Sequence, residues 1–232
     1  MPSASARGSI ERALAQSLHE GRIVFVLSGP AGAGKTTLSQ RVASVDPRVG
    51  LNVSCTTRPA RPGERPGSDY HFLEPAEFES LVKQGQMLEW AEVHGHLYGT
   101  RASDALAIMA TGRDVLLEID IQGGTAVRSK YPRTVLLFVV GPSFASTKAR
   151  LVGRGSEDDT EVARRLARAR EEIRLSNRYD YLIVNDDVNS AVSSIRSIIT
   201  AERARMTDPK YRALVADAES ANQIAKRDET NA

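Results

Sequence analysis

The sequence predicts an α/β fold in which a parallel sheet is flanked by helices. The segments 22–28 and 134–140 are short, apolar and rich in β-branched residues, which is typical of strands buried on both faces. After the first segment, Leu38, Val42 and Val45 recur at the spacing of one helical face. Strands that alternate with helices in this way build parallel sheets.

A glycine-rich loop separates the first predicted strand from the first predicted helix. Residues 29–36 read G-P-A-G-A-G-K-T and match G-x-x-x-x-G-K-[ST], the phosphate-binding loop, or P-loop. The glycines let backbone N–H groups point at phosphate oxygens, and the following helix adds its positive end. In such a loop Lys35 reaches the β- and γ-phosphates, and Thr36 places its hydroxyl on Mg²⁺. A glycine turn that binds nothing is the alternative, and the strand–loop–helix context disfavours it.

Composition narrows the class of protein. A chain of 232 residues is long enough for one core that carries a small inserted subdomain. Because 31 basic residues nearly balance 29 acidic ones, charge gives no argument for a nucleic-acid or membrane partner. The single cysteine, Cys55, excludes an internal disulfide and fits a reducing compartment. We therefore expect a soluble, cytoplasmic protein; the sequence does not predict its oligomeric state.

The two ends of the chain show weaker patterns. Ile10, Leu14 and Leu18 recur every fourth residue and predict a short amphipathic helix, which could dock on the body of the protein or on another subunit. The segment 207–232 has at most a weak helix around Tyr211 and no assigned role.

A basic segment follows the first predicted helix. Residues 53–72 contain prolines and glycines, which exclude a regular helix, together with Arg58, Arg61 and Arg65. Arginine presents a planar fork of donors that matches phosphate oxygens, so this segment is a candidate second phosphate site. From the residues alone, a solvated basic loop is equally consistent.

This segment carries a family resemblance. From Val53 it reads V-S-x-T-T-R-x-x-R-x-G-E-x-x-G-x-D-Y-x-F, and directly downstream of a P-loop this closely resembles the guanylate kinases. The resemblance spans about residues 22–205 and includes the segments 88–92, 98–100, 117–123, 153–155 and 183–186. It implies an enzyme of nucleotide salvage and purine metabolism, which uses ATP and Mg²⁺ to phosphorylate GMP or dGMP.

The resemblance also implies a division of the chain. It predicts a P-loop NTPase core from residues 22–52 and 102–206, with a helical lid at about 143–176. An inserted GMP-binding subdomain would occupy residues 53–101. The segments 1–21 and 207–232 would be an N-terminal extension and a C-terminal tail.

Glu89 is the residue that the resemblance assigns to the guanine base. Guanine offers N1–H and its 2-amino group side by side as donors, and one carboxylate accepts both, whereas adenine has an acceptor at N1. An exposed acid on a strand is the alternative reading of Glu89. The resemblance also puts Ser54, Thr100 and Glu118 near the base, although some relatives have aspartate at the position of Glu118.

The remaining expected ligands follow from the same resemblance. The GMP phosphate would be bound by Arg58, Arg61, Tyr70 and Tyr98, with Gly99 adjacent. Asn185 would lie beside the adenine ring. The expected ATP-binding set is Gly29, Pro30, Ala31, Gly32, Ala33, Gly34, Lys35, Thr36, Thr37 and Asn185.

Three cations would act on the transferred group. They are Lys35 and two lid arginines, Arg154 and Arg165, the latter chosen over Arg164 because the family pattern places arginine directly before leucine. A solvated face of a basic helix is the alternative for the lid. Asp120 follows a predicted strand and would either contact Mg²⁺ through water or make a structural hydrogen bond.

Three other functions are compatible with parts of the pattern. A related P-loop kinase with another phosphorylated acceptor would not need Glu89. A non-catalytic, protein-binding guanylate-kinase-like module would typically lose the P-loop, which is intact here. A P-loop NTPase that couples hydrolysis to motion would leave the arginine segment unexplained.

Overall fold

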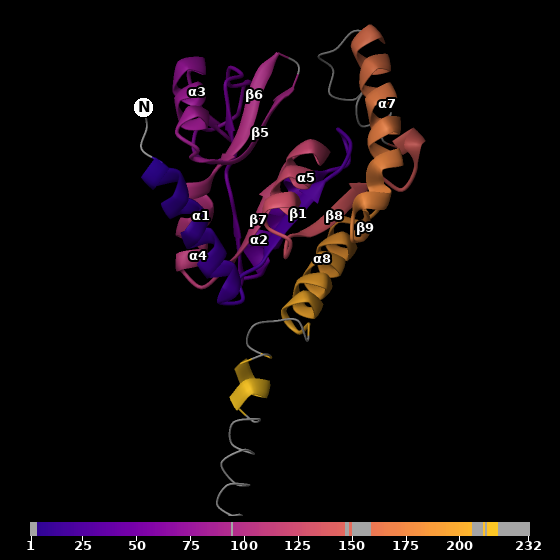
Figure 1. Ribbon diagram of the computed structural model, residues 1–232. Helices are drawn as coiled ribbons and strands as arrows, with labels where there is room; N and C mark the ends of the chain where they lie inside the picture. Colours follow the sequence, from indigo (N-terminus) through magenta and orange to yellow (C-terminus); the bar gives the residue numbers. More distant parts are fainter. Residues whose placement is uncertain are drawn as a thin grey trace, which may run out of the picture.

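The computed structural model describes residues 4–93, 95–146, 149, 159–205, 211 and 213–217. Within these residues the central sheet has five parallel strands in the order β2-β7-β1-β8-β9 (Figure 1). The strands are β1 (Val24–Ser28), β2 (Val49–Leu51), β7 (Asp114–Glu118), β8 (Val135–Val140) and β9 (Tyr181–Val184). The predicted parallel sheet is therefore confirmed.

Helices cover both faces of this sheet. Phe25 and Leu27 belong to the core cluster on the face of α2 (Lys35–Val45) and α8 (Val188–Arg203). Val24 and Val26 belong to the opposite cluster, under α1 (Ala4–His19), α4 (Ala102–Ala110) and α5 (Ile121–Lys130). Successive strand residues point to opposite faces, so a strand covered on both sides is apolar throughout. This explains why β1 is a continuous apolar run that is wholly buried.

A second, mixed sheet lies beside the central one. Its order among the described strands is β4-β3-β6-β5, in which β3 pairs parallel with β4 and antiparallel with β6. Its elements are β3 (Cys55–Thr56), β4 (His71–Phe72), α3 (Pro75–Lys83), β5 (Met87–Val93) and β6 (His96–Arg101). Phe78 of α3 packs with Cys55 and Met87 in a small separate core. All these elements fall between residues 53 and 101.

A long helix stands on the other side of the molecule from this second sheet. It is α7 (Asp159–Arg174), which continues through the 3₁₀ helix η1 (Leu175–Arg178) into β9 (Figure 1). Arg154 lies outside the described residues, and so does the side chain of Arg165.

The N-terminal helix docks on the body of this chain. α1 packs against α4, and Leu14 and Leu18 are buried in the core cluster on that face. At the end of α2, Val45 is 40% exposed, although its spacing from Leu38 predicted burial; it is the last residue of the helix, where the core contact ends. In the part of the chain that the structure describes, no helix has the length and apolar character needed to cross a bilayer.

The burial of Leu14 yields a stability prediction. Its side chain is 1% exposed, so Leu14→Ala should leave a cavity between α1 and α4 and lower the free energy of unfolding by about 2–5 kcal/mol. Arg12→Ala, on the exposed side of the same helix, should change it by less than about 0.5 kcal/mol. Urea unfolding of both variants measures the difference. Equal, small changes would show that α1 does not pack on the core in solution.

Candidate active site

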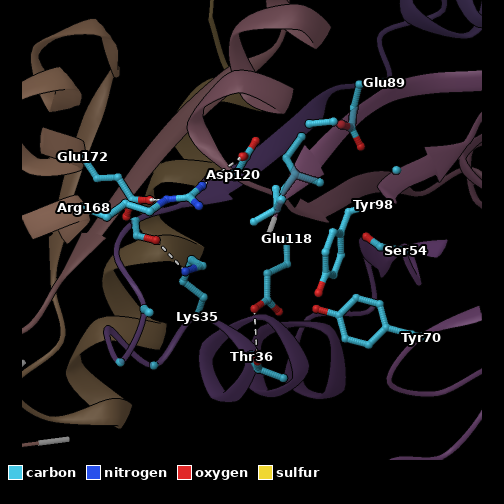
Figure 2. A pocket seen from close by; sticks show the side chains of 18 of the residues that line it. Lys35, Thr36, Ser54, Tyr70, Glu89, Tyr98, Glu118, Asp120, Arg168 and Glu172 are labelled. Atoms are coloured by element: carbon cyan, nitrogen blue, oxygen red, sulfur yellow. Dashed lines mark hydrogen bonds and ion pairs between the residues drawn. The ribbon is translucent and has the colours of Figure 1, made fainter. Parts of the chain in front are cut away.

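A cavity of about 350 Å³ opens at the carboxyl ends of β1 and β7, where parallel sheets bind ligands. The P-loop, the second sheet and α7 all contribute to its walls (Figure 2). Among the residues expected to bind nucleotides, those lining it are Gly29, Ala31, Gly32, Gly34, Lys35, Thr36, Thr37, Ser54, Arg61, Tyr70, Glu89, Tyr98, Gly99, Glu118 and Asp120. Residues far apart in sequence thus meet in one space.

Asn185 supports the P-loop through a hydrogen bond to its backbone. The Nδ2 atom of this buried asparagine donates to the carbonyl of Ala33 at 2.8 Å. Gly34 has a φ of 88°, and a Cβ atom there would lie 2.3 Å from Asn185 Nδ2. Only glycine therefore fits at this position. Asn185, expected beside adenine, supports the loop in this structure and is not among the residues that line the cavity.

The beginning of α2 is open toward the cavity. Gly34 is the N-cap of α2 and makes no side-chain capping hydrogen bond, so the first backbone N–H groups of the helix are available to an anion. Lys35 folds back over the loop, and its Nζ donates to the carbonyls of Gly29 at 2.5 Å and Pro30 at 3.2 Å. A phosphate entering the loop would meet this ammonium group.

Glu118 lies at the P-loop side of the cavity. Its carboxylate accepts hydrogen bonds from Thr36 Oγ1 at 2.7 Å and from Ser39 Oγ at 2.9 Å (Figure 2). Strand alternation explains this placement, because Glu118 shares a face of β7 with Leu116, which packs in the cluster beneath α2. The sequence analysis puts Glu118 near the base, whereas here it contacts the residue expected to hold Mg²⁺.

Asp120 caps α5 with one oxygen and faces α7 with the other. Its Oδ1 accepts from the backbone N–H of Gly123 at 2.8 Å, which is the structural hydrogen bond considered for this residue. Its Oδ2 is buried and lies 3.6 Å from Nη2 of Arg168. Asp120 therefore contacts both α5 and α7.

Glu89 is a buried acid on β5. Its side chain is 5% exposed, and Oε1 accepts from the hydroxyl of Thr100 at 2.7 Å. A Cβ atom at Gly123 would lie 2.7 Å from Oε2, so α5 approaches the carboxyl group closely. Burial raises the pKa of Glu89 to about 7; the hydrogen bond from Thr100 opposes this shift, and the nearby charge of Asp120 adds to it. The alternative of an exposed strand acid is therefore excluded for Glu89.

Arg58 is held by an acid that the sequence analysis did not single out. Its Nη1 and Nη2 donate to the two carboxylate oxygens of Glu64 at 2.9 and 2.8 Å. The guanidinium also lies over the ring of Tyr70, 5.4 Å from its centroid, and Nε is buried without a hydrogen-bond partner in the described structure. This bidentate pair shows that the site geometry suits a planar oxyanion.

Two tyrosines form the wall beside Arg58. The rings of Tyr70 and Tyr98 meet edge to face with centroids 6.0 Å apart, and both hydroxyls point into the cavity (Figure 2). Burial raises the pKa of Tyr70 to about 12, so its hydroxyl stays a donor. Arg61 lines the same part of the cavity.

The sequence analysis missed two residues of α7 that line the cavity. They are Arg168 and Glu172, and Arg168 Nε donates to Glu172 Oε1 at 2.9 Å. Their spacing of four residues was a visible signal, but the neighbouring charges on this helix have the same spacing. The expected lid residues, Arg154 and the side chain of Arg165, lie outside what the structure describes.

Comparisons with known proteins show relatives of this chain in one family. The sequence model of the guanylate kinase family matches residues 21–202. The chain is 44% identical to a guanylate kinase of Thermotoga maritima over 79% of this chain and 89% of that protein. It is 46% identical to one of Symbiobacterium thermophilum, over 79% and 87% of the two chains.

A solved structure of a guanylate kinase has a similar fold. The guanylate kinase of Anaplasma phagocytophilum superposes with a TM-score of 0.67 at 30% identity, covering 80% of this chain and 88% of that one. The family model covers most of the chain, and the cavity joins a P-loop to a buried acid and an arginine–tyrosine cluster. The chain therefore belongs to the guanylate kinase family.

Proposed function

We propose that this chain transfers the γ-phosphoryl group of ATP to GMP or dGMP, giving ADP and GDP. ATP would occupy the P-loop end of the cavity, and GMP the end formed by the second sheet. The observation that carries this proposal is Glu89, a buried carboxyl group that lines the same cavity as the P-loop. A P-loop that only hydrolyses ATP has no use for such a group, and the family membership supports the same activity.

At the GMP end, the carboxylate of Glu89 would accept N1–H and the 2-amino group of guanine. Thr100 fills only part of its acceptor capacity, because a carboxylate has about four lone-pair sites. Ser54 lines the same region and could also contact the base. The GMP phosphate would lie against Arg61 and the two tyrosine hydroxyls, and it would compete with Glu64 for Arg58.

At the ATP end, the residues of the P-loop and Thr37 would surround the β- and γ-phosphates, and Asn185 would support the loop through its hydrogen bond to Ala33. Thr36 and Glu118 fit a Mg²⁺ ion, because a hydroxyl and a carboxylate 2.7 Å apart at the cavity wall are the hard oxygen ligands that this ion prefers. When bound, Mg²⁺ would neutralise charge on the phosphates. Glu118 thus fits the metal better than the base.

The reaction needs charge neutralisation rather than a base. The second pKa of a phosphate monoester is near 6, so the GMP phosphate is already ionised at neutral pH. Its oxygen forms a bond to the γ-phosphorus as the bond to the β–γ bridging oxygen breaks, and the electron pair leaves with ADP. Two like charges 4 Å apart repel by about 4 kcal/mol at an effective dielectric of 20. We assign Lys35, Arg154 and Arg165 to offset this repulsion, with closure of α7 to exclude water.

Lys35→Met tests the ATP end. Phosphoryl transfer should fall by at least about a hundredfold, because the variant lacks the ammonium group that meets the phosphates. GMP affinity should stay within about threefold of wild type, since GMP binds at the other end of the cavity. Coupled assay of ADP release and calorimetric titration with GMP measure the two effects. Lys83→Met, on exposed α3, is the control, and an equal loss of GMP affinity would show that the acceptor site is misplaced.

Glu89→Gln tests the base specificity. IMP lacks the 2-amino group and AMP has an acceptor at N1, so the wild type should prefer GMP by up to about 10⁴-fold in kcat/KM. The variant replaces one acceptor oxygen by a donor and should lose most GMP activity while keeping its ATP affinity. Glu92→Gln, exposed on the same strand, should behave as wild type. Equal use of AMP and GMP by the wild type would disprove the proposed function.

The raised pKa of Glu89 predicts a pH dependence of GMP binding. Only the ionised carboxylate accepts both guanine donors, and burial puts its pKa at about 7 in the free protein. GMP affinity should therefore fall by up to about tenfold for each pH unit below that value and level off above it. Glu89→Gln should lack this component but keep the contribution from the GMP phosphate. Titration of both proteins between pH 5.5 and 8.5, a range of about one to two units on either side of that pKa, separates the two contributions.

A further inference from the structure

Arg168 places a positive charge at the wall of the cavity. It comes from α7, lines the cavity, and has a side chain that is 35% exposed. Its guanidinium lies between two carboxylates: Nε donates to Glu172 at 2.9 Å, and Nη2 is 3.6 Å from Asp120 Oδ2 (Figure 2). It therefore links the helix to the core of the protein through an acid of another element.

Charged side chains extend along the cavity from the P-loop toward Glu89. The positive charge of Lys35 acts on Glu172, and the negative charge of Asp120 acts on Glu89. Arg168 joins the two acids, so the order is Lys35, Glu172, Arg168, Asp120 and Glu89. All five residues line the cavity that lies between the P-loop and the second sheet. A phosphoryl group that moves from ATP to GMP has to cross that space.

Other arginines of α7 have different surroundings. Arg170 lies over the ring of Phe144, 5.0 Å from its centroid, and Arg174 pairs with Glu171 at 2.9 Å on the exposed side of the helix. Ion pairs within one exposed helix contribute little to stability. Arg168 has a similar pair with Glu172, but it also reaches Asp120, whose Oδ2 is buried and accepts no hydrogen bond in the described structure. An arginine that served only to stabilise α7 would not need the contact with Asp120.

We propose that Arg168 is a catalytic residue that contacts the transferred phosphoryl group, and that Glu172 and Asp120 hold it in place before the nucleotides bind. A guanidinium bonds carboxylate and phosphate oxygens through the same planar fork. The contact of 3.6 Å with Asp120 is longer than a hydrogen bond, so a phosphate oxygen at hydrogen-bond distance would be a stronger partner for the guanidinium than this carboxylate is. This inference rests on the proposed GMP kinase activity. It adds Arg168 of α7 to the two lid arginines that the family resemblance implies.

The contribution of Arg168 should appear in the chemical step. Arg168→Met and Arg168→Gln should lower the single-turnover rate of phosphoryl transfer from ATP to GMP on the order of tenfold to a thousandfold, as for other groups that stabilise transition-state charge. GMP affinity without ATP should change by less than about threefold, because the base and phosphate ligands remain. Arg168→Lys should recover part of the rate, since it keeps the charge but loses the fork. Added guanidinium ion at millimolar concentration should partly rescue Arg168→Met.

The control variant is Arg170→Met, which removes an arginine from the same helix and should leave the rate within about twofold of wild type. The proposal is overturned if Arg168→Gln, shown to be folded by circular dichroism, transfers phosphate at the wild-type rate. It is also overturned if Arg170→Met lowers the rate of phosphoryl transfer as much as Arg168→Met does. The same holds if Arg168→Met and Arg168→Gln weaken GMP binding and leave the rate of the chemical step unchanged. A wild-type protein that does not phosphorylate GMP would instead disprove the proposed function.

Discussion

The burial of β1 on both faces is the constraint on which the rest of the site depends. Its alternating residues enter two different core clusters, so the strand cannot shift without exposing apolar surface. The P-loop begins where β1 ends, and β7 and β8 pair on either side of it. Glu118 ends β7 and Asn185 follows β9, two strands on opposite sides of β1, and these side chains bond Thr36 and Ala33 of the loop. The packing of this one strand therefore fixes the position of the P-loop at its end of the cavity.

Electrostatics organises the cavity in the absence of nucleotides. Four acids among the described residues line it, and three of them hold a group that we assign to Mg²⁺ or to the transferred phosphate: Glu118 bonds Thr36, and Glu172 and Asp120 flank Arg168. Glu64 does the same for Arg58 nearby. A charged side chain pre-positioned by an acid is ready for a phosphate, which is a stronger and more highly charged acceptor. Glu89 is the exception, because burial favours its neutral form until guanine supplies two donors.

The positions of Glu118 and Asp120 in the site could not be predicted from the sequence alone. They are two residues apart at the end of one strand, and their residue types alone do not say which of them lies beside Thr36 and which beside α7. Strand alternation puts Glu118 on the α2 side, whereas Asp120 lies beyond the strand and caps α5. Arg168 shows the same limit, since it is one of several arginines on a basic helix. Only packing decides which of them turns toward the cavity.

By itself, the sequence determined the parallel α/β sheet, the P-loop and the inserted arginine–tyrosine segment. The sheet and the P-loop depend on local composition and spacing, such as the apolar run before Gly29 and the glycines around Lys35, whereas the inserted segment was identified by its resemblance to a family. The tertiary structure alone decided the burial and raised pKa of Glu89, the bracing of Ala33 by Asn185, and the position of Arg168. These features arise where elements distant in sequence meet, and burial and charge pairing there depend on three-dimensional distances that spacing along the chain does not contain.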